Sequence, residues 1–180
     1  MQIKDRVVLI TGASEGIGAA CAAEFDVALS DGLQIGDKAP AVEGKDQDGK
    51  TWKLADSVGK KVVLLYFYPK DDTPGCTIES CGLRDQYQKI RELGAEVLGV
   101  SVDSVESHQK FTQKFHLPFQ LLADTDKSIT KAYGALNDKS NMARRVTFLI
   151  DEHGKILKTF QTVKPDQHPQ EILDALNGKL

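Results

Sequence analysis

The chain has 180 residues, of which 41% are hydrophobic and 27% are charged, and its formal net charge is −3. This length corresponds to one ordinary domain with a sizeable core, and the composition is that of a globular protein. The small negative charge and the dispersed lysines give no basic surface for a nucleic acid or an anionic membrane.

The sequence also lacks targeting and membrane signals. It has no run of about 18 apolar residues, which excludes a transmembrane helix. Asp5, Glu15, Glu24 and Asp26 interrupt the region where a secretory leader would be apolar. We therefore expect a cytoplasmic protein that contacts neither membrane nor nucleic acid.

The first residues carry a strand–turn–helix pattern of their own. Residues 6–11 are apolar, residues 12–18 form a glycine-rich turn, and residues 19–25 are rich in alanine and favour a helix. Backbone amides at the start of such a helix can bind a nucleotide phosphate. The stretch resembles the opening of the short-chain dehydrogenases/reductases, whose T-G-x-x-x-G-x-G turn it matches in full.

That resemblance ends near Phe25, and no second buried strand follows, although a dinucleotide fold requires further βαβ units. Tyr66 and Lys70 have the spacing of that family's Tyr-x-x-x-Lys pair, but Pro69 places them at a strand end rather than on a helix face. We therefore expect residues 1–32 to be an extension that binds no cofactor, in front of a main domain at 33–180. Cys21 in this extension is expected to be a structural or free small residue.

The main domain begins with a hairpin and a buried strand. Strands at 41–43 and 51–54 flank a turn at 46–50. Residues 61–68 form a continuous apolar run with β-branched and aromatic members, which is typical of a central strand buried on both faces. A helix follows at 76–93.

The helix at 76–93 ends at Gly94, and five residues are expected on or near one apolar stripe: Ile78, Leu83, Tyr87, Ile90 and Leu93. The later predicted elements are strands at 95–102, 121–124, 144–150 and 156–163, with helices at 104–116, 128–133 and 168–176. This order is β-α-β-α-β-α followed by an antiparallel β-β-α unit. It predicts an α/β protein of the thioredoxin-like fold, with a mixed central sheet flanked by helices and an N-terminal β-hairpin.

Cysteine usage indicates redox chemistry. The three cysteines are too few for a disulfide framework, and the close pair Cys76 and Cys81 is more typical of a catalytic or redox site in a reducing compartment. A metal site is not expected, because the C-x4-C spacing has no histidine pair at ligand spacing beside it. Each histidine is expected at the surface: His108, His116, His153 and His168.

The predicted place of Cys76 at the start of a helix favours the thiolate form of its side chain. Unpaired N–H groups and roughly half a positive charge at that end stabilise a thiolate, which is the nucleophilic form of cysteine. Thr73 can place its hydroxyl beside the sulfur or a bound oxidant, and Pro69 and Pro74 fix the backbone of the turn. A lone buried cysteine is commonly only a small hydrophobe, but this combination followed by Cys81 argues against that interpretation.

Three segments are similar to one known family, and the similarity extends over residues 33–180. Residues 69–77 read Pro-Lys-Asp-Asp-Thr-Pro-Gly-Cys-Thr, residues 81–85 read Cys-Gly-Leu-Arg-Asp, and residues 145–151 form the later signature. They resemble the peroxiredoxins, and among them the bacterioferritin comigratory protein (PrxQ) group. The resemblance implies a thiol peroxidase of antioxidant defence that reduces hydrogen peroxide and organic hydroperoxides and takes electrons from thioredoxin or a similar dithiol.

The same resemblance assigns roles residue by residue. Cys76 would be the peroxidatic cysteine, and Cys81 the resolving cysteine that forms an intramolecular disulfide with it. Thr73 and Arg145 would complete the peroxide site, with Pro69 shielding it. A fixed guanidinium at Arg145 would stabilise the thiolate and donate to the peroxide oxygens as the O–O bond stretches.

Arg144 is an alternative to Arg145 by position alone. Neighbouring side chains on a strand point to opposite faces, so only one of the two can reach the site. The family pattern favours Arg145.

The spacing of the cysteine pair predicts a conformational switch. Positions i and i+5 of a helix lie about 7.5 Å apart along the axis and face about 140° apart, whereas disulfide Cα atoms must lie within about 7 Å with converging side chains. Cys76 and Cys81 therefore cannot join until the first helical turns unwind, after Cys76 is oxidised to a sulfenic acid. Gly82, Thr77 and Ile78 have low helix propensity and would permit this opening.

Three other functions are possible for this sequence. A general disulfide oxidoreductase would share the fold, but the C-x-x-C spacing is absent. A nicotinamide-dependent reductase would use the N-terminal turn, and a chaperone-like interaction protein would not turn over at all. An intramolecular bridge needs no second subunit, so we favour a monomer, with a dimer as the alternative.

Overall fold

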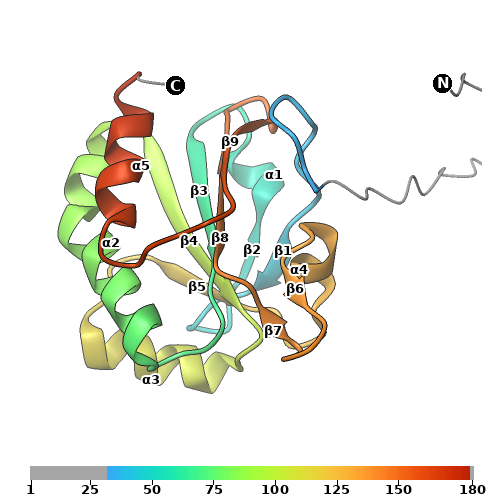
Figure 1. The fold of residues 1–180 in the computed structure, drawn as a ribbon, viewed down its shortest axis with the longest axis vertical. Helices are drawn as coiled ribbons and strands as arrows, with labels where there is room; N and C mark the ends of the chain where they lie inside the picture. Colours follow the sequence, from blue (N-terminus) through green and yellow to red (C-terminus); the bar gives the residue numbers. More distant parts are fainter. Residues whose placement is uncertain (1–31, 179–180) are drawn as a thin grey trace, which may run out of the picture.

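The structure is a computed structural model that describes residues 32–178. The expectations for the N-terminal strand–turn–helix pattern and for Cys21 lie outside the described residues. Within the described part, a mixed sheet runs through the centre of the molecule and helices cover both of its faces (Figure 1). The expected thioredoxin-like architecture is confirmed.

The central sheet contains seven strands in the order β2-β1-β5-β4-β3-β8-β9. Strands β3, β4 and β5 are parallel, and β8, β9, β1 and β2 extend the sheet by antiparallel pairing. Its strands are β1 Glu43–Lys45, β2 Thr51–Lys53, β3 Val62–Phe67, β4 Ala95–Ser101, β5 Gln120–Ala123, β8 Val146–Ile150 and β9 Ile156–Phe160. A small second sheet pairs β6 Leu136–Asn137 with β7 Met142–Ala143. The helices are α1 Leu54–Ser57, α2 Pro74–Glu92, α3 Val105–Phe115, α4 Ser128–Ala132 and α5 His168–Leu176.

Strand β3 is buried because apolar layers cover both of its faces. Leu64 and Tyr66 pack in the core that α2, α3 and α5 form with one face, whereas Leu65 and Phe67 pack in the core on the hairpin, α1 and α4 side. This explains why the strand is a continuous apolar run rather than an alternating one. Strand β3 therefore holds the loop that follows it, and the start of α2, rigidly against the molecule.

The first strand of the hairpin begins two residues later in the chain than the sequence predicted. The backbone N–H of Asp46 donates to the carbonyl of Lys50 at 2.8 Å, and the Asp46 carboxylate accepts from the N–H groups of Asp48 and Lys50, each at 2.9 Å. These bonds close the turn directly after Lys45, which pairs with Thr51. The turn chemistry therefore sets the register, and it moves β1 from 41–43 to Glu43–Lys45.

Other differences concern element ends and very short elements. Helix α2 begins at Pro74, two residues before the predicted start, because proline fits the first helical position, where no N–H is needed. Helix α1 and strands β6 and β7 were not predicted, since segments this short show no periodicity. Strands β8 and β9 are shorter than expected, and a register irregularity occurs between Leu149 and Ile150.

Among residues 32–178, no helix is both long and apolar enough to cross a membrane.

Candidate active site

Cys76 lies in the first turn of α2 and is almost completely buried, with 1% of its surface exposed. Nη2 of Arg145 donates to its sulfur at 3.2 Å. Gly75 makes room for this contact, because a Cβ atom at that position would lie 3.2 Å from the same Nη2. The sulfur therefore has a cation at hydrogen-bond distance and the N-terminal end of a 19-residue helix beneath it.

Sheet register brings Arg145 to Cys76 across a long sequence separation. Strands β3 and β8 pair antiparallel with Phe67 opposite Val146, so residue 145 emerges beside the end of β3. The chain leaving β3 passes through the 68–73 loop into α2, which returns Cys76 to the same place. The expected proximity of Arg145 to Cys76 is present, although both arginines precede β8 rather than lie in a strand.

Arg144 has a different environment. Its guanidinium donates to the carbonyl of Gly134, and its backbone N–H donates to Ala135 at 2.6 Å. Its side chain is exposed, so this arginine serves the 134–144 segment rather than Cys76. The two neighbouring arginines therefore have different partners: Arg144 binds the Gly134 carbonyl, and Arg145 binds Cys76.

Glu79 is a site residue that sequence reasoning missed. Its side chain is fully buried and forms an ion pair with Nη1 of Arg145. Burial raises the pKa of Glu79 from 4.5 to about 7, even though the Arg145 charge acts in the opposite direction. Burial alone would lower the pKa of Arg145, but the charges of Glu79 and Cys76 raise it above its ordinary value. One guanidinium thus serves a thiol and a carboxyl group.

The loop between β3 and α2 is held by a buried polar network around Asp71. Its carboxylate accepts from Ser107 Oγ at 2.7 Å, from Tyr68 Oη at 2.7 Å, and faces Nδ1 of His108 at 2.9 Å. Nε2 of His108 faces the carbonyl oxygen of Leu122 at 3.0 Å. The imidazole ring of His108 therefore connects the Asp71 carboxyl group to the Leu122 carbonyl. The loop is therefore fixed to α3 and β5.

The surface position expected for all histidines is wrong for two of them. His108 and His168 are both fully buried. Nε2 of His168 lies 2.8 Å from Oγ1 of Thr147, and burial lowers the pKa of His168. Buried histidines with polar partners cannot be distinguished from surface ones by spacing alone.

Helices α2 and α5 approach each other closely just after Cys81. A Cβ atom on Gly82 would lie 2.6 Å from Cγ of Pro169, so only glycine fits at this crossing. Gly82 was predicted as a weak point in the helix, and the structure adds a packing reason for it. The helix–helix contact lies directly C-terminal to the pair of cysteines.

Thr73 and Pro69 lie on the loop that precedes Cys76. Thr73 takes the N-cap position of α2, but its hydroxyl donates to the carbonyl of Lys70 at 3.1 Å rather than capping the helix. The expected place of this hydroxyl beside the sulfur or a bound oxidant stays a prediction. Pro69 is half-buried at the end of β3, next to the same loop.

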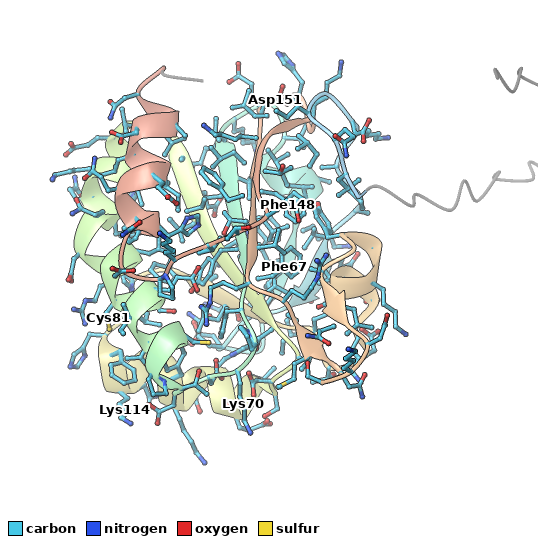
Figure 2. All side chains as sticks on the ribbon, viewed as in Figure 1. Phe67, Lys70, Cys81, Lys114, Phe148 and Asp151 are labelled. Atoms are coloured by element: carbon cyan, nitrogen blue, oxygen red, sulfur yellow. The ribbon has the colours of Figure 1, made fainter. Side chains whose placement is uncertain are left out.

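Cys81 lies on α2, and the structure holds both Cys76 and Cys81 as free thiols. Figure 2 shows Cys81 at the outer side of α2, away from the sheet residues Phe67 and Phe148. Both cysteines belong to one uninterrupted helix, so the geometric separation predicted from their spacing applies. Ile78, between them, is 52% exposed, which contradicts its predicted place on the apolar stripe.

Among residues 32–178, no three or more histidine, cysteine, aspartate or glutamate side chains gather in a group that could hold a metal ion. The arrangement at Cys76 therefore consists of a thiol, a guanidinium, a buried carboxyl group and a fixed loop. Such a set can stabilise a thiolate and the charge that develops on an oxygen attacked by it.

Comparisons with known proteins agree with this chemistry. The profile of the AhpC/TSA family matches residues 35–159. Peroxiredoxin Bcp of Bacillus subtilis (strain 168) is 45% identical over 150 residues, which cover 80% of this chain and 95% of that protein.

Two solved structures are similar in fold and sequence. Peroxidoxin BcpB from Mycobacterium tuberculosis has a TM-score of 0.75 and 30% identity, over 81% of this chain and 97% of that chain. The bacterioferritin comigratory protein of Xanthomonas campestris has a TM-score of 0.71 and 30% identity, over 77% of this chain and 91% of that chain. The Xanthomonas protein has alkyl peroxide reduction activity.

Proposed function

The chain belongs to the AhpC/TSA family, in its Bcp/PrxQ group, and from that premise we propose that Cys76 is the sulfur that attacks the hydroperoxide. Membership makes the protein a thiol-dependent peroxidase, with a hydroperoxide as substrate and a thiol as reductant. The observation that carries the assignment of Cys76 is the 3.2 Å hydrogen bond from Arg145 to its sulfur at the start of α2.

The first step is an attack of the Cys76 thiolate on one oxygen of the O–O bond. An S–O bond forms, the O–O bond breaks, and the leaving oxygen takes a proton to become water or an alcohol, while the sulfur becomes a sulfenic acid. Arg145 stabilises the thiolate before the attack and the charge on oxygen during it. The anchored 69–73 loop, with Pro69 and Thr73, forms the wall of the site beside the sulfur.

The second step closes the cycle within one chain. The Cys81 thiolate attacks the Cys76 sulfenic sulfur, an S–S bond forms, and hydroxide leaves and is protonated to water. Since both cysteines lie in α2, this step requires the first turns of the helix to open. Ile78 favours this opening because its exposed side chain adds little apolar burial to the helical state, and Gly82 favours it through its low helix propensity.

The remaining parts of the proposal concern partners and organisation. We propose thioredoxin or a similar dithiol protein as the reductant of the disulfide, and organic hydroperoxides as well as hydrogen peroxide as substrates. An intramolecular bridge needs no second subunit, so we propose a monomer, located in the cytoplasm, where dithiol reductants are available. Residues 33–180 form the peroxidase domain, and residues 1–32 are an extension without a cofactor.

Amide hydrogen exchange tests the switch. We expect the N–H groups at 76–84 to be protected in the reduced protein and to exchange at least tenfold faster after one equivalent of peroxide, because the disulfide cannot form in an intact helix. Mass spectrometry of peptic peptides from reduced and oxidised protein measures this. Strand β4, at Ala95–Ser101 in the middle of the sheet, provides an internal reference whose protection should change little.

The matched control is Cys81→Ser treated in the same way. Its Cys76 is oxidised but has no resolving thiol, so the 76–84 segment should keep the protection of the reduced protein. Equal protection of reduced and oxidised wild type, with the disulfide present, would contradict the proposed opening.

A further inference from the structure

Glu79 lies inside the segment that must open, three residues after Cys76 and two before Cys81. We infer that Glu79 is a proton-linked latch, which holds the first turns of α2 helical when protonated and lets them open when ionised. The inference rests on the proposed disulfide between Cys76 and Cys81. It makes the resolving step of the peroxidase cycle dependent on pH through a residue that forms no bond to the substrate.

The contacts of Glu79 leave its ionised form poorly satisfied. The side chain has no exposed surface, its Oε2 pairs with Nη1 of Arg145, and its Oε1 has no hydrogen-bond partner among the described residues. A carboxylate has about four acceptor sites, and a buried charge with an unpaired oxygen is destabilising. Removal from water penalises the charged carboxylate more than the neutral acid, so the helical state favours protonated Glu79.

Among the charged and titratable groups around Glu79, one cation opposes that preference, and it is shared with Cys76. Arg145, from the segment before β8, is the cation in contact, and its Nη2 donates to Cys76 on α2. Tyr66, on β3, is a neutral phenol whose pKa burial raises well above 10, and it bonds Ser80 rather than Glu79. His168, on α5, interacts with Arg145, and burial lowers its pKa. One guanidinium therefore faces two groups that can be anionic.

The direction of the pH effect follows from the two states of Glu79. In the helix, burial raises the pKa of Glu79 to about 7, against 4.5 for the exposed group. Between these values the helical state holds a proton that the opened state releases. The stability of the helix relative to the opened segment therefore falls as pH rises through this interval, by up to about tenfold per pH unit, and changes no further above it.

Opening must remove Glu79 from its buried site. A separation of five residues can close into a disulfide only if the turn that contains Glu79 loses its helical geometry. Its ion pair with Arg145 then breaks, and the carboxyl group enters water. Resolution itself remains the balanced step in which sulfenic acid and thiol give disulfide and water, and Glu79 contributes only a proton that is bound or released on opening.

The reduction potential of the Cys76–Cys81 couple, measured against pH, tests the latch. Redox titrations in dithiol buffers from about pH 5 to about pH 7 should show that wild type takes up one proton more per disulfide reduced than Glu79→Gln. That is an extra tenfold change in the equilibrium constant per pH unit, or 29.6 mV for a two-electron couple. Glu92→Gln, which changes an exposed glutamate of the same helix, should behave as wild type.

A second measurement uses only the wild-type chain, in case Glu79→Gln does not fold. The side-chain carboxyl carbon of Glu79, followed by NMR in uniformly labelled protein, should titrate near pH 7 in the reduced form and near 4.5 in the disulfide form. Two results would overturn the latch but leave the proposed function standing. One is equal proton uptake on reduction of the disulfide in wild type and Glu79→Gln, and the other is the same titration of Glu79 in both redox states. Absence of any Cys76–Cys81 disulfide would contradict the proposed function instead.

Discussion

Replacing Cys76 by serine is expected to abolish hydroperoxide reduction, with turnover falling by at least three orders of magnitude. Serine is a very weak nucleophile at neutral pH, and its oxygen cannot form a sulfenic acid or a disulfide. Arg145, Glu79 and the anchored loop would remain, yet they would have no sulfur to stabilise. Peroxide consumption with dithiothreitol or with thioredoxin as the electron source measures the loss.

The other two cysteines give matched controls for this experiment. With thioredoxin as the electron source, Cys81→Ser should consume one equivalent of peroxide per chain and then stop. Its sulfenic acid forms, but no disulfide follows that thioredoxin could reduce. Cys21→Ser, in the extension, should keep the turnover of wild type. Full activity of Cys76→Ser would contradict the mechanism, and loss of activity in Cys21→Ser would show that the wrong pair of cysteines has been assigned.

Changing Arg145 to lysine is expected to slow the oxidation of Cys76 by about 10²-fold, the usual effect of removing one donor that stabilises a developing oxyanion. Lysine keeps the positive charge, so Glu79 retains an opposite charge in its buried site. It lacks the fork of fixed donors with which Arg145 contacts Glu79 and Cys76 at once. Stopped-flow oxidation of the reduced protein by hydrogen peroxide, in a single turnover, measures the rate without the reductant.

Arg144→Lys is the control for that substitution, since the neighbouring side chain contacts the Gly134 carbonyl and is exposed. Its oxidation rate should stay within about twofold of wild type, because surface substitutions away from the site have small effects. Circular dichroism of each variant shows that the fold is retained. Oxidation of Arg145→Lys at the wild-type rate would remove the arginine from the proposed mechanism.

The helix that carries the cysteines shows how a sequence pattern can mislead. Residues 76, 79, 80 and 83 have the i, i+3, i+4, i+7 spacing of one helical face, and all four are buried. The sequence interpretation placed the apolar Ile78 on the stripe and overlooked Glu79, because a glutamate is rarely buried without a partner. Its partner, Arg145, is remote in sequence, yet a helix wheel centred on Cys76 and Leu83 would have identified Glu79.

Long-range polar contacts are the other feature of this structure that the sequence did not predict. Order and type of the main strands and helices follow from periodicity and turn residues, and the central strand at Val62–Phe67 is predictable from its apolar run alone. The Asp71–His108 pair joins residues 37 apart, and neither spacing nor composition indicates it. Arg145 was assigned by family resemblance, since only the pairing of β3 with β8 brings it to Cys76.

The central claim is an intramolecular disulfide between Cys76 and Cys81, formed after peroxide oxidises Cys76. Cleavage after Lys70 and Arg84 by trypsin leaves both cysteines in one peptide, residues 71–84. After one equivalent of peroxide and thiol blocking, mass spectrometry should find this peptide two hydrogen atoms lighter and unmodified by the blocking reagent. A peptide 71–84 linked to a second copy of itself, or to the peptide that contains Cys21, would contradict the account.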